Sequence, residues 1–197
     1  MKSDAVLLHV PVGVWQKMIA YVTICSTEIN GFGLVDVIGP NEFALSDVFI
    51  TDQVAAAAKV EWTELGLALC ITDLINRGDD PRRLRFQWHS HVNMQAFFSD
   101  IDTGGIEKWS GDWLISLVVN KHGEYEVRLD MFKSLRIRNI PVTIVFDNPI
   151  DPDLIAQCQA DIAQHVSQPK PHKIKVTRYV PGFTDFLDIA TGDDQYA

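Results

Sequence analysis

Two histidines stand two residues apart at the end of a segment in which apolar and polar residues alternate. In residues 84–91 the apolar Leu84, Phe86 and Trp88 alternate with polar residues, which predicts a strand with His89 and His91 together on its polar face. Two imidazoles on one side of a strand can bind a single ion. Two nitrogen ligands and one carboxylate leave the fourth tetrahedral position open to water, which is the arrangement of a catalytic zinc site.

The carboxylate best placed to complete this set is Asp102. Ser99 and Asp102 are three residues apart, so a helix that begins at Ser99 presents both side chains to the same space. We expect residues 92–98 to form a loop that brings the start of this helix back over the end of the strand.

Hydrolysis at such a site also needs a carboxylate that does not bind the metal. This group takes a proton from the attacking water and later protonates the leaving nitrogen. Glu28 is the candidate, because it lies at the junction of a predicted helix and the glycine-bounded strand predicted over residues 31–39. The site therefore draws on three separate segments.

Taken together, these residues resemble the signature of the JAMM (JAB1/MPN+) zinc metalloproteases, in a prokaryotic or phage-type branch. The resemblance lies in Glu28, the pair His89-x-His91, seven intervening residues, and Ser99-x-x-Asp102. It implies that His89, His91 and Asp102 bind one catalytic Zn²⁺ ion with water as the fourth ligand. It further implies that Glu28 is the general base and that Ser99 donates a hydrogen bond to the developing oxyanion.

Two positions depart from the usual pattern of this family. Val92 stands where many members have proline, and Asn30 stands where a cysteine is frequent. Neither residue is expected to be a ligand, so the chemistry is retained and the departures indicate a divergent branch.

The resemblance also implies a fold and a substrate. The fold is of the α/β (α+β) class, an MPN/cytidine-deaminase-like curved mixed β-sheet flanked by helices. Residues 1–150 would form the catalytic core, and residues 151–197 a C-terminal helix and tail packed on or extending the same domain. The substrate would be a ubiquitin-like protein or its conjugate, cut at a peptide or isopeptide bond after its C-terminal tail.

Hydrophobic periodicity predicts the elements that must position these residues. Strands are expected over residues 6–10, 31–39, 43–50, 84–91, 113–120, 125–132 and 140–146, with one more possible over residues 174–179. Helices are expected after residue 10, from Asp52 to about Gly78, from Ser99 to about Trp109, and from Asp151, which Pro152 follows as at a helix start. This mixture predicts a single domain in which strands and helices are interspersed without strict alternation.

Composition narrows the classes of function. The 197 residues are 47% hydrophobic and 22% charged, which suffices for one domain with its own core. The net charge of −9 argues against nucleic acid or an anionic membrane as the partner. Three cysteines cannot all pair with one another, and no secretory or membrane-spanning segment is evident, so we expect a cytoplasmic protein.

Each motif also has an ordinary interpretation. A lone His-x-His is usually a polar strand face, Ser-x-x-Asp is a common helix start, and Glu28 could be a solvated helix end. The occurrence of all these motifs together, at the spacing of the metalloprotease signature, favours a metal site over these ordinary interpretations. A basic cluster, Arg82, Arg83 and Arg85, could be a solvated strand start or could contact the tail of a partner.

Two other functions stay open. A phage-type peptidase acting on a tail protein or a cell-wall peptide would use the same metal chemistry. A non-catalytic MPN scaffold would only assemble partners, but such scaffolds typically lose metal ligands, and the complete ligand set counts against this alternative. The sequence does not specify the oligomeric state.

Overall fold

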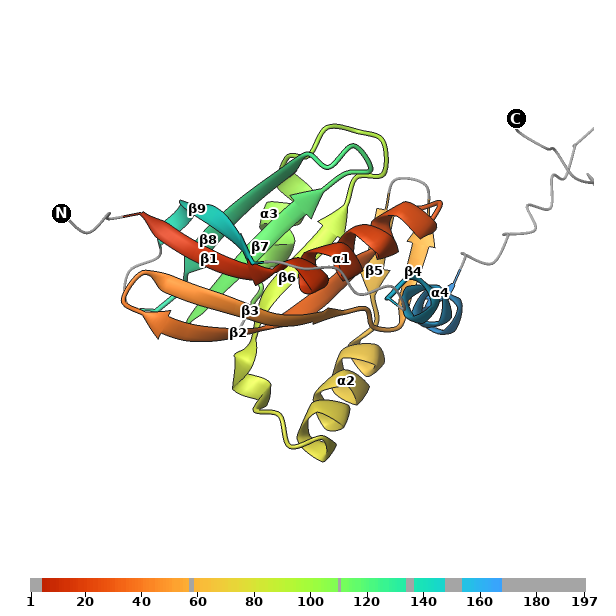
Figure 1. Ribbon diagram of the computed structural model, residues 1–197, viewed down its shortest axis with the longest axis horizontal. Helices are drawn as coiled ribbons and strands as arrows, with labels where there is room; N and C mark the ends of the chain where they lie inside the picture. The colour runs from red at the N-terminus through yellow and green to blue at the C-terminus, as the bar shows by residue number, and fades with distance from the viewer. Residues whose placement is uncertain (1–4, 57–58, 110, 134–136, 148–153, 168–197) are drawn as a thin grey trace, which may run out of the picture.

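Seven strands close into a barrel in the part of the chain that the structure describes. This computed structural model describes residues 5–56, 59–109, 111–133, 137–147 and 154–167 (Figure 1). The strand order around the barrel is β1-β3-β2-β6-β7-β8-β9. The strands are β1 (Val6–Pro11), β2 (Asn30–Gly39), β3 (Glu42–Phe49), β6 (Leu84–Ser90), β7 (Trp113–Val119), β8 (Tyr125–Met131) and β9 (Ile137–Asp147).

Closure of the barrel overturns the fold expected from the sequence. The whole length of β1 pairs in parallel with β9, from Val6 opposite Val142 to Pro11 opposite Asp147. On its other side β1 pairs in parallel with β3. The predicted α/β (α+β), MPN/cytidine-deaminase-like curved sheet flanked by helices is therefore wrong. The alternation of apolar and polar residues predicts where each strand lies in the sequence. It does not predict which distant strand will pair with it.

A second sheet replaces the beginning of an expected helix. The segment after Asp52 forms the hairpin β4 (Gln53–Ala56) and β5 (Lys59–Trp62), and β10 (Val166–Ser167) joins it in the order β10-β4-β5. Helix α2 (Glu64–Asn76) begins only after Thr63, whose side chain accepts a hydrogen bond from the Gly66 amide at 2.9 Å. The prediction of a helix from Asp52 is therefore wrong at its beginning.

The side chain of Gln53 explains this difference. Its Oε1 accepts a hydrogen bond from the Asn30 amide at 2.9 Å, and its Nε2 donates to the Asn30 carbonyl at 3.0 Å. These bonds tie the start of β4 to the start of β2. A tertiary contact of this kind outweighs the helix propensity of the alanines that follow, because propensity contributes less than about 1 kcal/mol per residue.

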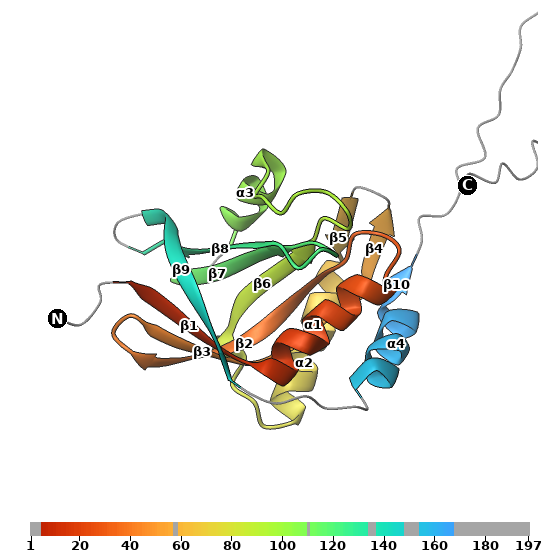
Figure 2. The ribbon, with the colours of Figure 1, turned by 45° about the horizontal axis from the view of Figure 1, so that its top comes forward.

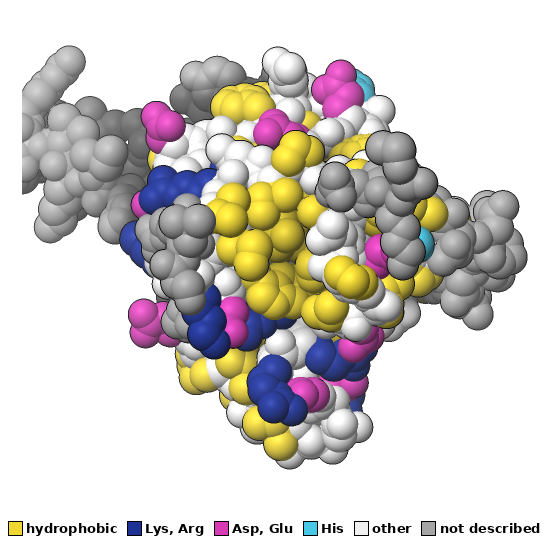
Figure 3. Space-filling view, turned by 90° about the vertical axis from the view of Figure 1, so that its left-hand side faces the viewer, with side chains coloured by type: hydrophobic (Ala, Val, Ile, Leu, Met, Phe, Trp, Pro, Cys, Tyr) yellow, Lys and Arg dark blue, Asp and Glu magenta, His cyan; other side chains and the backbone are white. Residues whose placement is uncertain are grey.

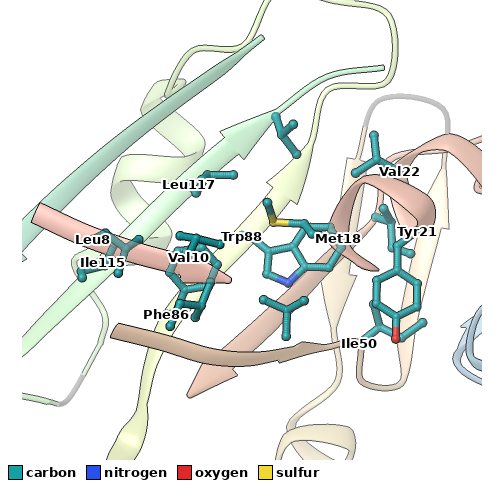
Figure 4. Packing of buried hydrophobic residues seen from close by; sticks show 14 of the residues in the cluster. Leu8, Val10, Met18, Tyr21, Val22, Ile50, Phe86, Trp88, Ile115 and Leu117 are labelled. Carbon is teal, nitrogen blue, oxygen red and sulfur yellow. The ribbon is translucent and has the colours of Figure 1, made fainter. Parts of the chain in front are cut away.

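Helix α1 (Val12–Ile24) packs against the interior of the barrel. Met18 and Tyr21 of this helix are buried against Trp88 of β6 (Figure 4). The rings of Tyr21 and Trp88 stack with centroids 6.0 Å apart. Burial of large side chains of this kind stabilises a fold by about 2–3 kcal/mol each. Because Trp88 points inward, its neighbour His89 must point to the outer face of the barrel.

Helix α4 (Leu154–His165) lies beside α1 (Figure 2). The Tyr21 hydroxyl donates a hydrogen bond to the Asp161 carboxylate, and Cys158 is fully buried in the main core cluster. The helix start expected at Asp151 and the strand expected over residues 174–179 lie outside the described residues. None of the described helices is long and apolar enough to cross a membrane.

The two ends of the barrel differ in character. Strand directions place the start of β1 at one end, together with the end of β2 and the junction of β8 and β9. Hydrophobic side chains gather near the centre of the face seen from that side (Figure 3). Exposed apolar residues at this end include Val37, Ile38, Met131 and Ile137. The ends of β6 and β7, which carry the candidate site, lie at the opposite end.

Gly31 provides a test of the packing between β2 and its neighbours. A Cβ atom at this position would lie 2.3 Å from the carbonyl oxygen of Phe49 and 2.6 Å from Nε1 of Trp88. We expect Gly31→Ala to lower the free energy of unfolding by about 1–3 kcal/mol in urea denaturation. The control is Gly13→Ala in α1, where the added methyl group meets no atom within 4 Å outside the adjoining helix backbone and a gain of about 0.5–1 kcal/mol is expected. Equal stabilities of the two variants would contradict this packing.

Cysteine reactivity provides a test of the contact between α4 and α1. Burial raises the pKa of Cys158 and of Cys70 to about 11, but Cys158 is fully buried whereas Cys70 is half-buried. We expect iodoacetamide at pH 8 to modify Cys70 faster than Cys158 in the native protein, because access and not the thiol pKa distinguishes them. Mass spectrometry measures both rates, which should converge in urea. Faster native modification of Cys158 would mean that α4 is not docked.

Candidate metal centre

Strand β6 delivers both histidines to one end of the barrel. Its apolar residues Leu84, Phe86 and Trp88 are buried, and His89 faces the other side, as the alternation predicts. His91 follows directly after the strand, and its amide donates to the Val119 carbonyl of the parallel strand β7 at 2.9 Å. Both imidazoles thus lie at the carboxyl end of β6, beside the carboxyl end of the parallel strand β7.

Helix α3 (Asp100–Ile106) brings the carboxylate. Ser99 caps the helix: its Oγ accepts a hydrogen bond from the Asp102 amide at 3.2 Å, and the Asp102 carboxylate accepts one from the Ser99 amide at 2.8 Å. This reciprocal capping box fixes the first turn of a short helix. The helix expected from Ser99 to about Trp109 thus begins where predicted and ends at Ile106.

The three predicted ligands converge at this point. The Nε2 atoms of His89 and His91 are 3.2 Å apart. The His89 Nε2 atom lies 3.3 Å from Asp102 Oδ1, and the His91 Nε2 atom lies 3.9 Å from Asp102 Oδ2. Tetrahedral zinc with bonds of about 2.0–2.2 Å separates its ligand atoms by roughly 3.3–3.6 Å. Two imidazoles and one carboxylate at this spacing are therefore suited to a zinc ion.

A neighbouring carbonyl orients one of the two imidazoles. The His91 Nδ1 atom lies 3.0 Å from the Gln95 carbonyl oxygen, to which it donates when it carries the proton. This tautomer leaves the His91 Nε2 lone pair free to bind a metal, as an outer hydrogen bond does in many zinc sites. Phe97 contacts the same ring edge-on, with centroids 5.1 Å apart.

The Asp102 carboxyl group remains ionised. Burial by itself would raise its pKa, but the interaction with His89 and the hydrogen bonds from Ser99 outweigh burial and hold the pKa well below the usual range. A carboxylate that does not bind a proton is available to bind a cation.

The fourth predicted residue, Glu28, lies beside this cluster. Ser90, between the two histidines, donates its amide to the Ile29 carbonyl at 2.8 Å and accepts the Ile29 amide on its Oγ at 3.1 Å. These two bonds hold the residue next to Glu28 against β6. The Glu28 side chain is buried, and burial raises its pKa, with His89 lowering it and Asp102 raising it. Both groups are thus near enough to influence the ionisation of Glu28.

The fifth predicted residue, Ser99, is engaged with Asp102. Its hydroxyl donates to Asp102 Oδ2 at 2.6 Å and accepts from the Asp102 amide. The structure therefore shows Ser99 as an orienting partner of the carboxylate. To donate to a substrate oxygen, the hydroxyl proton has to turn away from Asp102.

Val92 occupies an unusual backbone conformation directly after the second histidine. Its φ angle is 49°, in the left-handed region that a β-branched side chain rarely adopts. A proline ring holds φ near −65°, so proline is incompatible with this turn. The departure from the family pattern at Val92 therefore has a structural counterpart in the path of the loop.

The basic cluster is separate from the site. Arg83 forms two hydrogen bonds with Asp36, at 2.7 and 2.6 Å, and Arg82 pairs with Asp80. These residues precede or begin β6, whereas the histidines end it. The arginines are thus engaged at the opposite end of the strand, which favours their structural interpretation.

Sequence reasoning missed the residues that hold the site together. Ser90 had no distinguishing signal apart from its place between the histidines. Asn120, only 1% exposed, donates its side-chain amide to the Met94 carbonyl at 2.9 Å and so fastens the loop after His91. Arg128 and Asp130, two residues apart on β8, are buried and paired. Their spacing on a predicted strand could have indicated a shared polar face.

Comparisons with known proteins identify the fold only. No protein-family model matches the chain, and no curated protein matches its sequence. Among solved structures, the chain is similar to the solution structure of protein DSY2949 from Desulfitobacterium hafniense, with a TM-score of 0.52 and 12% sequence identity. The similarity covers 75% of this chain and 97% of that chain. At this identity it concerns the arrangement of the backbone and carries no function.

The capping box predicts different effects for two helix-capping variants. Ser99→Ala and Thr63→Ala each remove an N-cap side chain, and each should cost about 1 kcal/mol of stability in urea denaturation. Only Ser99→Ala also releases the Asp102 carboxylate, so it should weaken zinc binding by about tenfold in a chelator competition assay. Thr63→Ala should bind zinc as the wild type does. Wild-type zinc affinity in Ser99→Ala would show that the cap does not orient the ligand.

Proposed function

We propose that this protein is a zinc-dependent hydrolase of peptide or isopeptide bonds. The observation that supports this most is a buried carboxylate, Glu28, beside the point where His89, His91 and Asp102 converge. Three ligands of this kind with a free carboxylate nearby are the components of a catalytic zinc site. A structural zinc site would instead use four protein ligands.

Each residue has a defined role in this proposal. His89, His91 and Asp102 would hold the zinc ion, which would supply the Lewis acidity for hydrolysis of the scissile bond. The Glu28 carboxylate accepts a proton from the attacking water as its oxygen bonds to the carbonyl carbon, then gives that proton to the nitrogen as the C–N bond breaks. Ser99 donates a hydrogen bond from its hydroxyl group to the developing oxyanion.

The proposed substrate is the C-terminal tail of a ubiquitin-like protein, free or in a conjugate. The JAMM-like spacing of the site residues supports this class. The resemblance rests on the motif alone, since the closed barrel departs from the fold that the resemblance implies. Met94, Phe97 and Ile101 add exposed apolar surface on the loop and helix that carry the site, which suits apolar side chains of a peptide.

An extended tail also has a strand edge at which to bind. Strand β5 ends the three-stranded sheet β10-β4-β5. Its neighbour β4 is joined through Gln53 to Asn30, which lies opposite His89 in the pairing of β2 with β6. An extended peptide that adds to such an edge gains main-chain hydrogen bonds without demanding a particular sequence.

We place the reaction in the cytoplasm. The three cysteines are free, as expected in a reducing compartment. Thiols do not take part in the proposed site, so their oxidation state does not enter the chemistry.

The test combines metal analysis with cleavage assays. We expect about one zinc ion per purified chain. We also expect chelator-sensitive release of a peptide fused to the C-terminus of a ubiquitin-like protein encoded near this gene. Glu28→Gln should retain zinc and lose activity by at least 100-fold, because it removes the proton acceptor and keeps the shape of the side chain. His89→Ala should lose both zinc and activity, whereas the control His122→Ala, at an exposed turn, should lose neither.

Other outcomes would favour different functions. Zinc binding with cleavage of peptidoglycan peptides or phage tail proteins, and not of ubiquitin-like fusions, would favour the phage-type peptidase. Zinc binding without any cleavage would favour a scaffold. Full zinc occupancy in His89→Ala would show that the ligand assignment is wrong.

A further inference from the structure

Arg128 is a buried charge on the outer face of β8. Its side chain is 7% exposed, and its Nε donates to Asp130 Oδ2 at 2.9 Å. Asp130 is almost fully buried as well, and its Oδ1 accepts the Asn139 amide at 3.2 Å. Buried charges are costly unless they are paired, so this ion pair has to be held in a defined geometry.

The guanidinium of Arg128 also extends to the segment that carries Asp102. Its Nη1 donates to Thr103 Oγ1 at 3.3 Å, and its Cζ lies 4.5 Å from the centre of the Phe98 ring. Phe98 directly precedes Ser99, and Thr103 directly follows Asp102. Arg128 therefore contacts the chain on both sides of the capping box.

Helix α3 depends on contacts of this kind. It has seven residues, two of which are Gly104 and Gly105, and an isolated helix of this length and composition is not stable in water. Near the carboxylate, Asp102 itself approaches His89, and the Phe98 ring contacts the His89 ring edge-on. Further along the chain, Ile106 is buried, and Glu107 pairs with the partly exposed Arg138 at 2.5 Å. Arg128 adds the contacts on both sides of the carboxylate that do not involve a candidate ligand.

We infer that Arg128 is a positioning residue of the metal centre, which fixes Asp102 by clamping Phe98 and Thr103 against the barrel. This inference rests on the proposed zinc site and adds a residue that touches none of its ligands. The guanidinium lies over the Phe98 ring while it donates to Asp130 and Thr103. Lysine has the same charge but not this planar set of donors, so it cannot reproduce the clamp.

The experiment compares four variants with the wild type. Arg128→Met removes the clamp, Arg128→Lys keeps only the charge, and Thr103→Val removes one contact while leaving the pair with Asp130 intact. Arg138→Met is the matched control, because it removes an arginine contact at the far end of the same helix. The measurements are zinc affinity by chelator competition, kcat and KM, and hydrogen exchange of the amides of residues 103–106 in metal-free protein.

We expect zinc affinity to fall about 10- to 100-fold in Arg128→Met, the range found when outer contacts of metal ligands are removed. Arg128→Lys should recover part of this loss, Thr103→Val should lose severalfold, and Arg138→Met should remain within twofold of the wild type. Hydrogen exchange in α3 should accelerate in the same order. At saturating zinc, kcat should fall more than KM changes, because Asp102 is displaced whereas the surface that binds substrate is retained.

The outcomes separate this inference from the proposed function. Wild-type zinc affinity and α3 exchange in both Arg128→Met and Thr103→Val would overturn the inference. If Arg128→Met does not fold, Thr103→Val alone decides it. If the wild type binds no zinc, the proposed function is wrong, and unchanged exchange in the variants would then overturn the clamp as well. Equal losses in Arg138→Met would also overturn it, because the effect would then belong to the helix in general.

Discussion

The Asp102 carboxylate belongs both to the N-terminal cap of α3 and to the candidate metal-ligand set. It accepts the Ser99 amide and hydroxyl to close the first turn of α3, and it approaches His89 and His91 from β6. Removal from water disfavours its ionised form, and the His89 imidazole and the hydrogen bonds from Ser99 outweigh that cost. The first turn of α3 and the candidate ligand set therefore share the Asp102 carboxylate. The loop after β6, the strained Val92 and the contacts of α3 with the barrel all serve to hold it at this point.

A few hydrogen bonds also hold the other polar groups of the site in place. Ser90 fastens Ile29, and so Glu28, to β6 with two hydrogen bonds, while the neighbouring Trp88 is packed into the core. Side chains alternate between the two faces of β6. The aromatic side chains on its inner face therefore anchor the strand in the core, and the residues on its outer face form the site. A packed core resists small displacements, which gives the outward side chains a rigid base.

Local patterns anticipated much of the site and less of the fold. The shared face of His89 and His91 follows from strand periodicity, and the pairing of Ser99 with Asp102 is a helix-start signature, so both were visible in the sequence. The position of Glu28 was predictable, but the bonds of Ser90 that hold it were not. The hairpin after Asp52 depends on Gln53 reaching Asn30, and the barrel depends on β9 reaching β1. Such pairings join distant segments and leave no local pattern.

The place of β1 between β3 and β9 has a consequence for how the chain folds during synthesis. The seam between β1 and β9 joins residues near the two ends of the barrel sequence, so it can form only after nearly the whole barrel has left the ribosome. Until then β1 presents an unpaired edge along its whole length, with Leu8 and Val10 lacking their burial in the finished core. An unpaired edge of this kind can pair with another chain until β9 closes the barrel.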